Sequence, residues 1–295
     1  MAAATAQAEA PALADAEGRT IEKANAGRVI AVGGAITEII YALGAQAALA
    51  AVDTTSQYPP DALKRLPNVG YMRALSAEGV LSLRPTLVIA EGEAGPPAAL
   101  TQLKAAGAAV VLLRKDPSPE GVVYKIHAVA RLLGREREGE ALAAAFTADM
   151  ATLTGAIAKA EKKPRVLFVL NASRGVLAAG QNTAADHIIA LAGGVNAIQG
   201  YTGYKPLAAE SVIAGKPDFI LATEHGLAAS GGADALLKRP DLAETPAGRG
   251  RQVIAMNAQL LLGFGPRTPA AVHALAQKLH PGLPLPPLKS GVADQ

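Results

Sequence analysis

The chain has 295 residues, of which 50% are hydrophobic and 18% charged, a balance that supports a sizeable core and excludes a disordered chain. The net charge is only +3 and no basic run is longer than Lys162–Lys163, which argues against a nucleic-acid partner. The sequence has no cysteine, so it excludes disulfides, thiol nucleophiles and cysteine-bound zinc, and it has no apolar run as long as the roughly 18–20 residues of a membrane span.

The N-terminal stretch is rich in alanine. Residues 1–15 lack the charged and apolar regions of an intact signal peptide, although Ala2–Ala8 fits the small-residue end of one. We therefore expect residues 1–27 to be a disordered segment.

Residues 28–117 alternate short apolar runs with helical patterns. Continuous apolar runs bounded by glycine indicate strands that are buried on both faces, and their alternation with helices predicts a parallel sheet. The expected strands are 28–32, 48–52, 87–90 and 110–113, and the expected helices are 37–43, 77–83 and 98–106. This segment is therefore predicted to be an N-terminal α/β lobe.

The pattern then changes. Residues 118–163 contain helix formers and no strand signal, which predicts one long helix between two lobes. Strands resume at 165–169, 219–222 and 252–255, so 164–284 is predicted to be a second α/β lobe, followed by a tail over 285–295.

The two lobes resemble each other internally. Residues 75–90 and 207–222 share a helix that carries Glu78 or Glu210, a basic residue before proline, and an apolar strand. The fold class that follows is α/β, with two Rossmann-like lobes, each with a parallel sheet, joined by a single long α-helix.

The first candidate site residues are Tyr71 and Arg73, in the loop that leads into the 77–83 helix. A tyrosine oxygen suits ferric iron once it is ionised, but a free phenol has a pKa of about 10. An arginine two residues away can favour the phenolate by hydrogen bonding and charge. A tyrosine with a nearby arginine is also common without any ligand.

A set of short motifs resembles the periplasmic heme-binding proteins of bacterial ABC-type hemin importers. The resemblance spans about residues 28–279 and is carried by Val69–Arg73, Ala90–Pro97, Gly180–Asp186, Gly203–Glu210 and Leu262–Arg267. It implies a class III (cluster A) binding-protein fold, in which Tyr71 is the axial ligand of ferric heme b and Arg73 supports it. It also implies a periplasmic monomer that buries heme in an interlobe cleft.

The same resemblance implies a docking role for the two repeated glutamates. The carboxylates of Glu78 and Glu210 would each form ion pairs with arginines of an inner-membrane permease dimer. A carboxylate at a helix start is also favoured by the helix dipole, and both roles can hold together.

Further contacts are expected from the second lobe. Some relatives use a second axial histidine in the loop 171–175, where this chain has none, and Arg174 either pairs with a heme propionate or is a solvated loop residue. Tyr204 and Lys205 mirror Gly70–Tyr71 as contacts, or form a turn with Pro206. His225 is a second ligand or a loop residue. We expect His127 and His187 to be structural, and His273 and His280 to be surface or helix-cap residues.

Two alternatives remain for the ligand and the activity. The same fold binds ferric siderophores or corrinoids, although such clefts usually need several Arg or Trp contacts and this chain has no Trp. A metal chelatase would need an acid–base pair, for which only Glu91, Glu93, Glu224 and His225 are available. The Gly33-Gly34 turn lacks the later glycines of a dinucleotide site, so we expect no enzyme.

Overall fold

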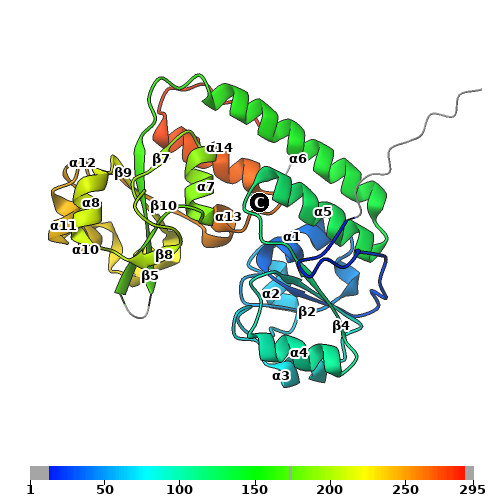
Figure 1. The fold of residues 1–295 in the computed structure, drawn as a ribbon. Coiled ribbons are helices and arrows are strands. Elements are labelled where there is room, and N and C mark those ends of the chain that lie inside the picture. Colours follow the sequence, from blue (N-terminus) through cyan, green and yellow to red (C-terminus); the bar gives the residue numbers. More distant parts are fainter. Residues whose placement is uncertain (1–12, 173–174, 290–295) are drawn as a thin grey trace, which may run out of the picture. The chain divides into compact units, whose positions relative to one another are not determined.

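The computed structural model describes residues 13–172 and 175–289, which divide into two compact units. Of these residues, 13–115 and 124–140 form the first unit, and 116–123 and 141–289 form the second. Both units consist of a sheet with helices packed on it (Figure 1), so the predicted α/β class is confirmed. In the described part of the chain, no helix is both long and apolar enough to cross a membrane.

The sheet of the first unit is fully parallel, as predicted. Its strands lie in the order β2-β1-β3-β4, with bounds β1 Val29–Val32, β2 Leu49–Val52, β3 Leu87–Glu91 and β4 Ala109–Leu113. All four residues of β1 are fully buried, because a central parallel strand is covered on both faces. Alternate residues Ile30 and Val32 belong to the hydrophobic cluster under α3 and α4.

The helices of this unit cover both faces of the sheet. Their bounds are α1 Gly34–Ala42, α2 Asp61–Arg65, α3 Ala77–Ser82 and α4 Pro97–Ala105. The α3 helix begins where the Ser76 hydroxyl accepts a hydrogen bond from the Gly79 N–H at 3.2 Å, a standard N-cap. α1 and α5 lie on the face opposite α3 and α4 (Figure 1).

The expected single long helix over 118–163 is divided in two. It consists of α5 (Pro119–Leu133) and α6 (Glu136–Ile157), which break at Gly134, where φ is 64°. After a left-handed residue the chain cannot continue the helix, and the Arg135 N–H instead bonds to the Ala130 carbonyl at 2.8 Å. α6 then packs on α5 at Gly139, where an added Cβ would lie 2.5 Å from the Ala130 Cβ.

The sheet of the second unit is mixed, which corrects the expectation of a parallel one. Its order is β10-β9-β5-β6-β8, with a short β7 beside β5. The bounds are β5 Arg165–Ala172, β6 Gly175–Ala179, β7 Val195–Asn196, β8 Tyr204–Pro206, β9 Phe219–Thr223 and β10 Val253–Met256. β10, β9 and β5 are parallel as predicted, but β6 folds back antiparallel to β5 from Gly175 (φ 116°), and β8 is antiparallel to β6.

The helices of the second unit also cover both faces of their sheet (Figure 1). Their bounds are α7 Ala184–Leu191, α8 Ala209–Gly215, α9 Glu224–Ala229, α10 Gly232–Leu237, α11 Pro240–Ala243, α12 Pro246–Arg249, α13 Ala258–Leu262 and α14 Thr268–Leu279. Val212, Leu236 and Leu242 from α8, α10 and α11 join the strand residues in one hydrophobic cluster.

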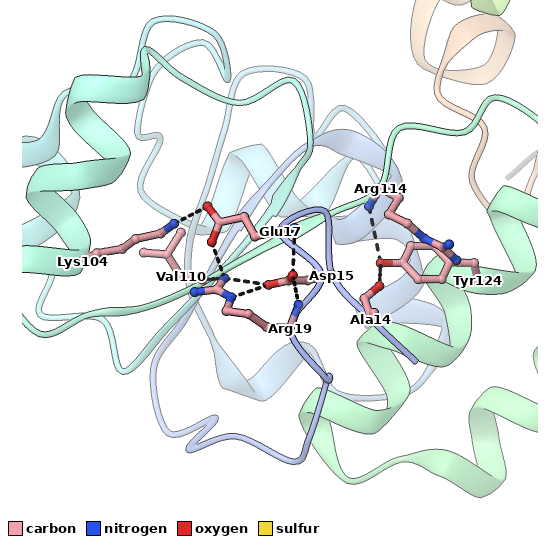
Figure 2. A network of polar contacts seen from close by, with 8 residues as sticks. All are labelled: Ala14, Asp15, Glu17, Arg19, Lys104, Val110, Arg114 and Tyr124. Carbon is pink, nitrogen blue, oxygen red and sulfur yellow. Dashed lines mark hydrogen bonds and ion pairs between the residues drawn. The ribbon is translucent and has the colours of Figure 1, made fainter. Parts of the chain in front are cut away.

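Residues 13–24, here called the N-terminal strap, lie along the edge strand β4. The Ala16 N–H bonds to the Leu112 carbonyl at 2.7 Å. The Arg19 guanidinium bonds to the Val110 carbonyl at 3.0 Å (Figure 2). Asp15 is 4% exposed and holds Arg19 by an ion pair of 2.6 Å. These contacts cover strand groups that would otherwise be open to pairing with another chain.

The strap also reaches α5. The Tyr124 hydroxyl donates to the Ala14 carbonyl at 2.7 Å, and the Arg114 guanidinium lies 3.9 Å over the Tyr124 ring (Figure 2). The expectation that residues 1–27 are disordered is therefore wrong for the strap, because its polar side chains find partners in distant segments. Residues 1–12 lie outside the described part.

Candidate functional site

Tyr71 lies at the carboxyl edge of the first sheet, in a segment held alongside the end of β2. The Val69 N–H bonds to the Val52 carbonyl, and the Thr54 N–H bonds to the Gly70 carbonyl, both at 2.9 Å. Gly70 has φ 89°, a conformation that glycine adopts without cost. The Tyr71 residue is 45% exposed and lies at the edge of the sheet where ligands of parallel sheets bind.

A tight turn links Tyr71 to Arg73. The Ala74 N–H bonds to the Tyr71 carbonyl at 2.8 Å, and the Met72 side chain between them is buried. The turn is joined to the loop after β3 because the Gly95 N–H bonds to the Met72 carbonyl at 2.9 Å. Tyr71 is therefore presented from a fixed backbone.

Arg73 forms an ion pair with Glu93, and Glu93 forms a second ion pair with Lys115. Burial opposes the ionisation of Glu93, but the two bases outweigh it and lower the pKa of this carboxyl. The sequence predicts Arg73 as a partner of Tyr71, and the structure identifies Glu93 as a partner of Arg73. Sequence reasoning missed Lys115, and it named Glu93 only as a possible acid.

Glu91 is the last residue of β3, two residues before Glu93. Its carboxylate is 3.4 Å from the ammonium of Lys125, a residue of α5 that is almost fully buried. Its Cγ would be only 2.4 Å from a Cβ added at Gly33, so glycine is required there by close approach. Glu91 therefore packs inside the first unit as a structural ion pair.

Asp53 has a structural role as well. Its fully buried carboxylate accepts hydrogen bonds from the Gly33 N–H at 2.9 Å and from the Ser56 hydroxyl at 3.0 Å. The Gly33-Gly34 turn and Asp53 are thus parts of one internal network at the start of α1.

Tyr204 and Lys205 lie on the edge strand β8 of the second sheet. The Tyr204 ring packs edge-on against Phe168, with ring centroids 6.3 Å apart. The Lys205 ammonium lies 4.9 Å above the Tyr201 ring, a cation–π contact. Both residues are exposed, and they belong to a strand instead of the proposed turn.

His225 is exposed in the first turn of α9, directly after β9. It lies at the carboxyl end of a parallel strand, as expected, although in a helix and not in a loop. Arg174 lies outside the described residues.

His280 is structural, since its ring nitrogen is 3.1 Å from the Ala192 carbonyl oxygen. Among the described residues, no three His, Cys, Asp or Glu side chains gather as a metal cluster.

Glu78 and Glu210 occupy the first turns of α3 and α8, and both are exposed. Within the described chain, neither carboxylate is engaged in an ion pair or hydrogen bond. Beside Glu210 lies a shallow groove of about 540 Å³, lined by Ala209, Ile213, Arg239, Pro240 and Asp241. Ile213 is 63% exposed there, so α8 presents an acidic and an apolar side chain one turn apart.

A family model described as a periplasmic binding protein matches residues 29–260. The chain is 48% identical to the solved periplasmic heme-binding protein BhuT in complex with two hemes, over 87% of this chain and 99% of that chain, with a TM-score of 0.82. The chain is 44% identical to the periplasmic heme-binding protein RhuT from Roseiflexus sp. RS-1 in apo form. The match covers 88% of this chain and 100% of that chain, with a TM-score of 0.84. The curated vitamin B12-binding protein of Vibrio cholerae is 28% identical over 85% of this chain and 88% of its own length. The chain therefore belongs to the periplasmic binding protein family.

Proposed function

We propose that this protein captures ferric heme b through the Tyr71 oxygen as axial iron ligand and delivers it to an ABC-type permease dimer in the inner membrane. The observation that carries the proposal is the exposed Tyr71, presented from a fixed turn at the carboxyl edge of a parallel sheet. Support comes from the similarity to solved heme-binding proteins over nearly the whole folded chain.

The chemistry of the turn suits this ligand. A phenolate is a hard anionic donor that binds ferric iron, as in the tyrosine-ligated heme of catalase. Arg73, two residues from Tyr71, offers a guanidinium that can support an anionic ligand oxygen once iron is bound. The large apolar face of a porphyrin would supply affinity by burial, and the metal bond would fix its orientation. No chemical step on the heme is required, and the protein acts as a carrier.

In the second unit we propose four residues as further heme contacts. Tyr204 and Lys205 offer a ring and an ammonium on an exposed edge strand, and His225 offers an accessible imidazole. Arg174, outside the described residues, would pair with a propionate through its two-pronged guanidinium. Since loop 171–175 has no histidine, we favour a five-coordinate iron with Tyr71 as its protein ligand.

The decisive experiment is a hemin titration of the wild-type protein beside Tyr71→Phe, followed by visible spectroscopy. We expect saturable binding with a high-spin ferric spectrum and a tyrosinate charge-transfer band that is lost in Tyr71→Phe. Tyr204→Phe is the matched control, because it removes a hydroxyl from another exposed tyrosine and keeps the ring that packs on Phe168. A band that survives in Tyr71→Phe and disappears in Tyr204→Phe would transfer the ligand role to Tyr204.

Location and partners follow from the same proposal. A carrier that serves an inner-membrane permease acts in the periplasm, and we propose that it does so as a monomer. Glu78 and Glu210 would dock on the permease, because both are exposed first-turn carboxylates without a partner among the described residues. Two separate charges fix an orientation that one charge could not.

A corrinoid is the second candidate ligand, and the similarity to the vitamin B12-binding protein of Vibrio cholerae is the observation that favours it. Ferric siderophores remain a third class. A competition titration separates these ligands, with cyanocobalamin or a ferric siderophore added to the hemin complex. We expect neither compound to displace hemin at equal concentration. Tight cyanocobalamin binding that Tyr71→Phe leaves unchanged would favour the corrinoid function.

A further inference from the structure

Arg73, Glu93 and Lys115 form a cluster, here called the charge triad, with one acid between two bases. Glu93 contacts both bases by ion pairs, and its side chain is 27% exposed, against 55% for Arg73 and 61% for Lys115. The triad carries a formal charge of +1, since one carboxylate compensates one of two cations. All three residues belong to the first unit, as does Tyr71.

The backbone holds the three segments of the triad together. The Leu75 N–H bonds to the Gly95 carbonyl at 2.9 Å, which joins the turn of Arg73 to the loop of Glu93. A Cβ at Gly92 would lie 2.6 Å from the Leu113 carbonyl oxygen, so that loop rests on the end of β4, two residues before Lys115. The backbone segments that carry the triad are thus joined to one another by contacts that do not involve the three charged side chains.

Arg73 places the triad next to Tyr71 along the chain, so the charges of the triad act through space on iron held at Tyr71. Arg73 is two residues from Tyr71, so their Cα atoms lie within about 8 Å of each other. A positive charge near the iron destabilises Fe³⁺ more than Fe²⁺, and a negative charge does the opposite. A unit charge placed about 8 Å from the iron, with an effective dielectric constant of about 60, would change the ratio of the two affinities about threefold.

We propose that Glu93 and Lys115 are specificity-determining residues that set the preference of the Tyr71 site for ferric over ferrous heme. Glu93 strengthens the ferric preference by compensating one cation, and Lys115 weakens it. The lowered pKa of Glu93 supports this role, because it keeps the carboxylate charged at neutral pH. The inference rests on the proposed heme function and adds to it a charge balance that acts through the iron.

The test compares variants that change the net charge of the triad. For each heme-loaded variant, the reduction potential of the bound iron is measured at low ionic strength. Glu93→Gln should favour ferrous heme about threefold, a shift of about 30 mV to more positive potential. Lys115→Met should shift the potential by a similar amount in the other direction. The double variant has the wild-type charge and should return to the wild-type potential. Raising the salt concentration should shrink all shifts.

Lys104→Met is the matched control, since it removes a lysine of the same unit that pairs with Glu17 and not with the triad. It should leave the potential unchanged, and Glu93→Asp should preserve the wild-type value. Shifts of the same sign in both single variants, or no shift in either, would overturn the inference. Failure of the proposed function is a separate outcome, because the wild-type protein would then show no tyrosinate band. Circular dichroism before loading identifies any variant that has not folded.

Discussion

Asp15 is the clearest case of a buried carboxylate whose ionisation stabilises the fold. Burial opposes its charge, but hydrogen bonds from the Arg19 and Glu17 N–H groups and the Arg19 guanidinium outweigh it, so the pKa of Asp15 is lowered. A carboxyl with a lower pKa in the folded state stabilises the protein fully above its unfolded value of about 4. That stabilisation disappears as the pH falls through the folded value.

We therefore expect Asp15→Asn to lower the free energy of unfolding by about 1–2 kcal/mol at pH 7. The difference from wild type should shrink as the pH falls below about 4, because the unfolded chain then binds the proton, and it should vanish once the pH passes the lowered pKa of the folded carboxyl. Urea unfolding at pH 7 and pH 3 measures both values. Glu17→Gln is the control, since Glu17 is a more exposed acid of the same strap and should cost less than about 1 kcal/mol. A deficit for Asp15→Asn that is independent of pH would contradict this account.

At the scale of elements, the approach of α6 to α5 depends on Gly139. An added Cβ would lie 2.5 Å from the Ala130 Cβ, closer than carbon atoms approach, so Gly139→Ala must push the two helices apart. We expect a loss of about 1–3 kcal/mol in the free energy of unfolding. Gly155→Ala is the matched control on the same helix, where nothing lies within 4 Å. It should stabilise the protein by about 0.5–1 kcal/mol through helix propensity.

Thermal or urea unfolding of the two alanine variants provides the comparison. Equal stability changes would show that the α5–α6 contact does not constrain the fold. The expected difference in sign isolates packing from propensity, because both variants make the same chemical change in the same helix.

At the scale of the whole molecule, docking should depend on both glutamates and leave heme capture intact. Glu78→Lys and Glu210→Lys should each weaken binding to the permease in nanodiscs about tenfold or more, since like charges then face each other. Hemin affinity should stay at the wild-type value. Glu136→Lys is the control, because Glu136 is also an exposed first-turn glutamate, in α6. Permease binding that is unaffected by both reversals would exclude these two residues as the docking charges.

Continuous apolar strands made most of the fold predictable from the sequence. The run Val29–Val32 signals β1 by itself, because burial on both faces leaves no polar position. By contrast, β8 was not predicted, since Tyr204, Lys205 and Pro206 are all exposed on a sheet edge and show no alternation. The break between α5 and α6 depends on the backbone of one residue, Gly134, and because glycine also occurs inside helices, its presence alone does not show that the helix ends there.

The candidate site was predictable only in part. Tyr71 and Arg73 are neighbours in sequence, so their chemistry is visible in one short motif. Glu93 pairs with Arg73, and Lys115 pairs with Glu93, from positions just after β3 and β4, and the sequence does not show that these strand ends meet. Long-range ion pairs of this kind have no local pattern.

The N-terminal strap has a consequence for the order in which the chain folds. Arg19 bonds to Val110, 91 residues further on, and Ala14 bonds to Tyr124 across 110 residues. The strap can therefore dock only after β4 and α5 have formed, and contacts of such separation form slowly. Until then the edge of β4 stays open, and another copy that has not finished folding can pair with it. The strap precedes these segments in the chain but is among the last parts to reach its place, and the concentration of incompletely folded chains affects how readily they associate.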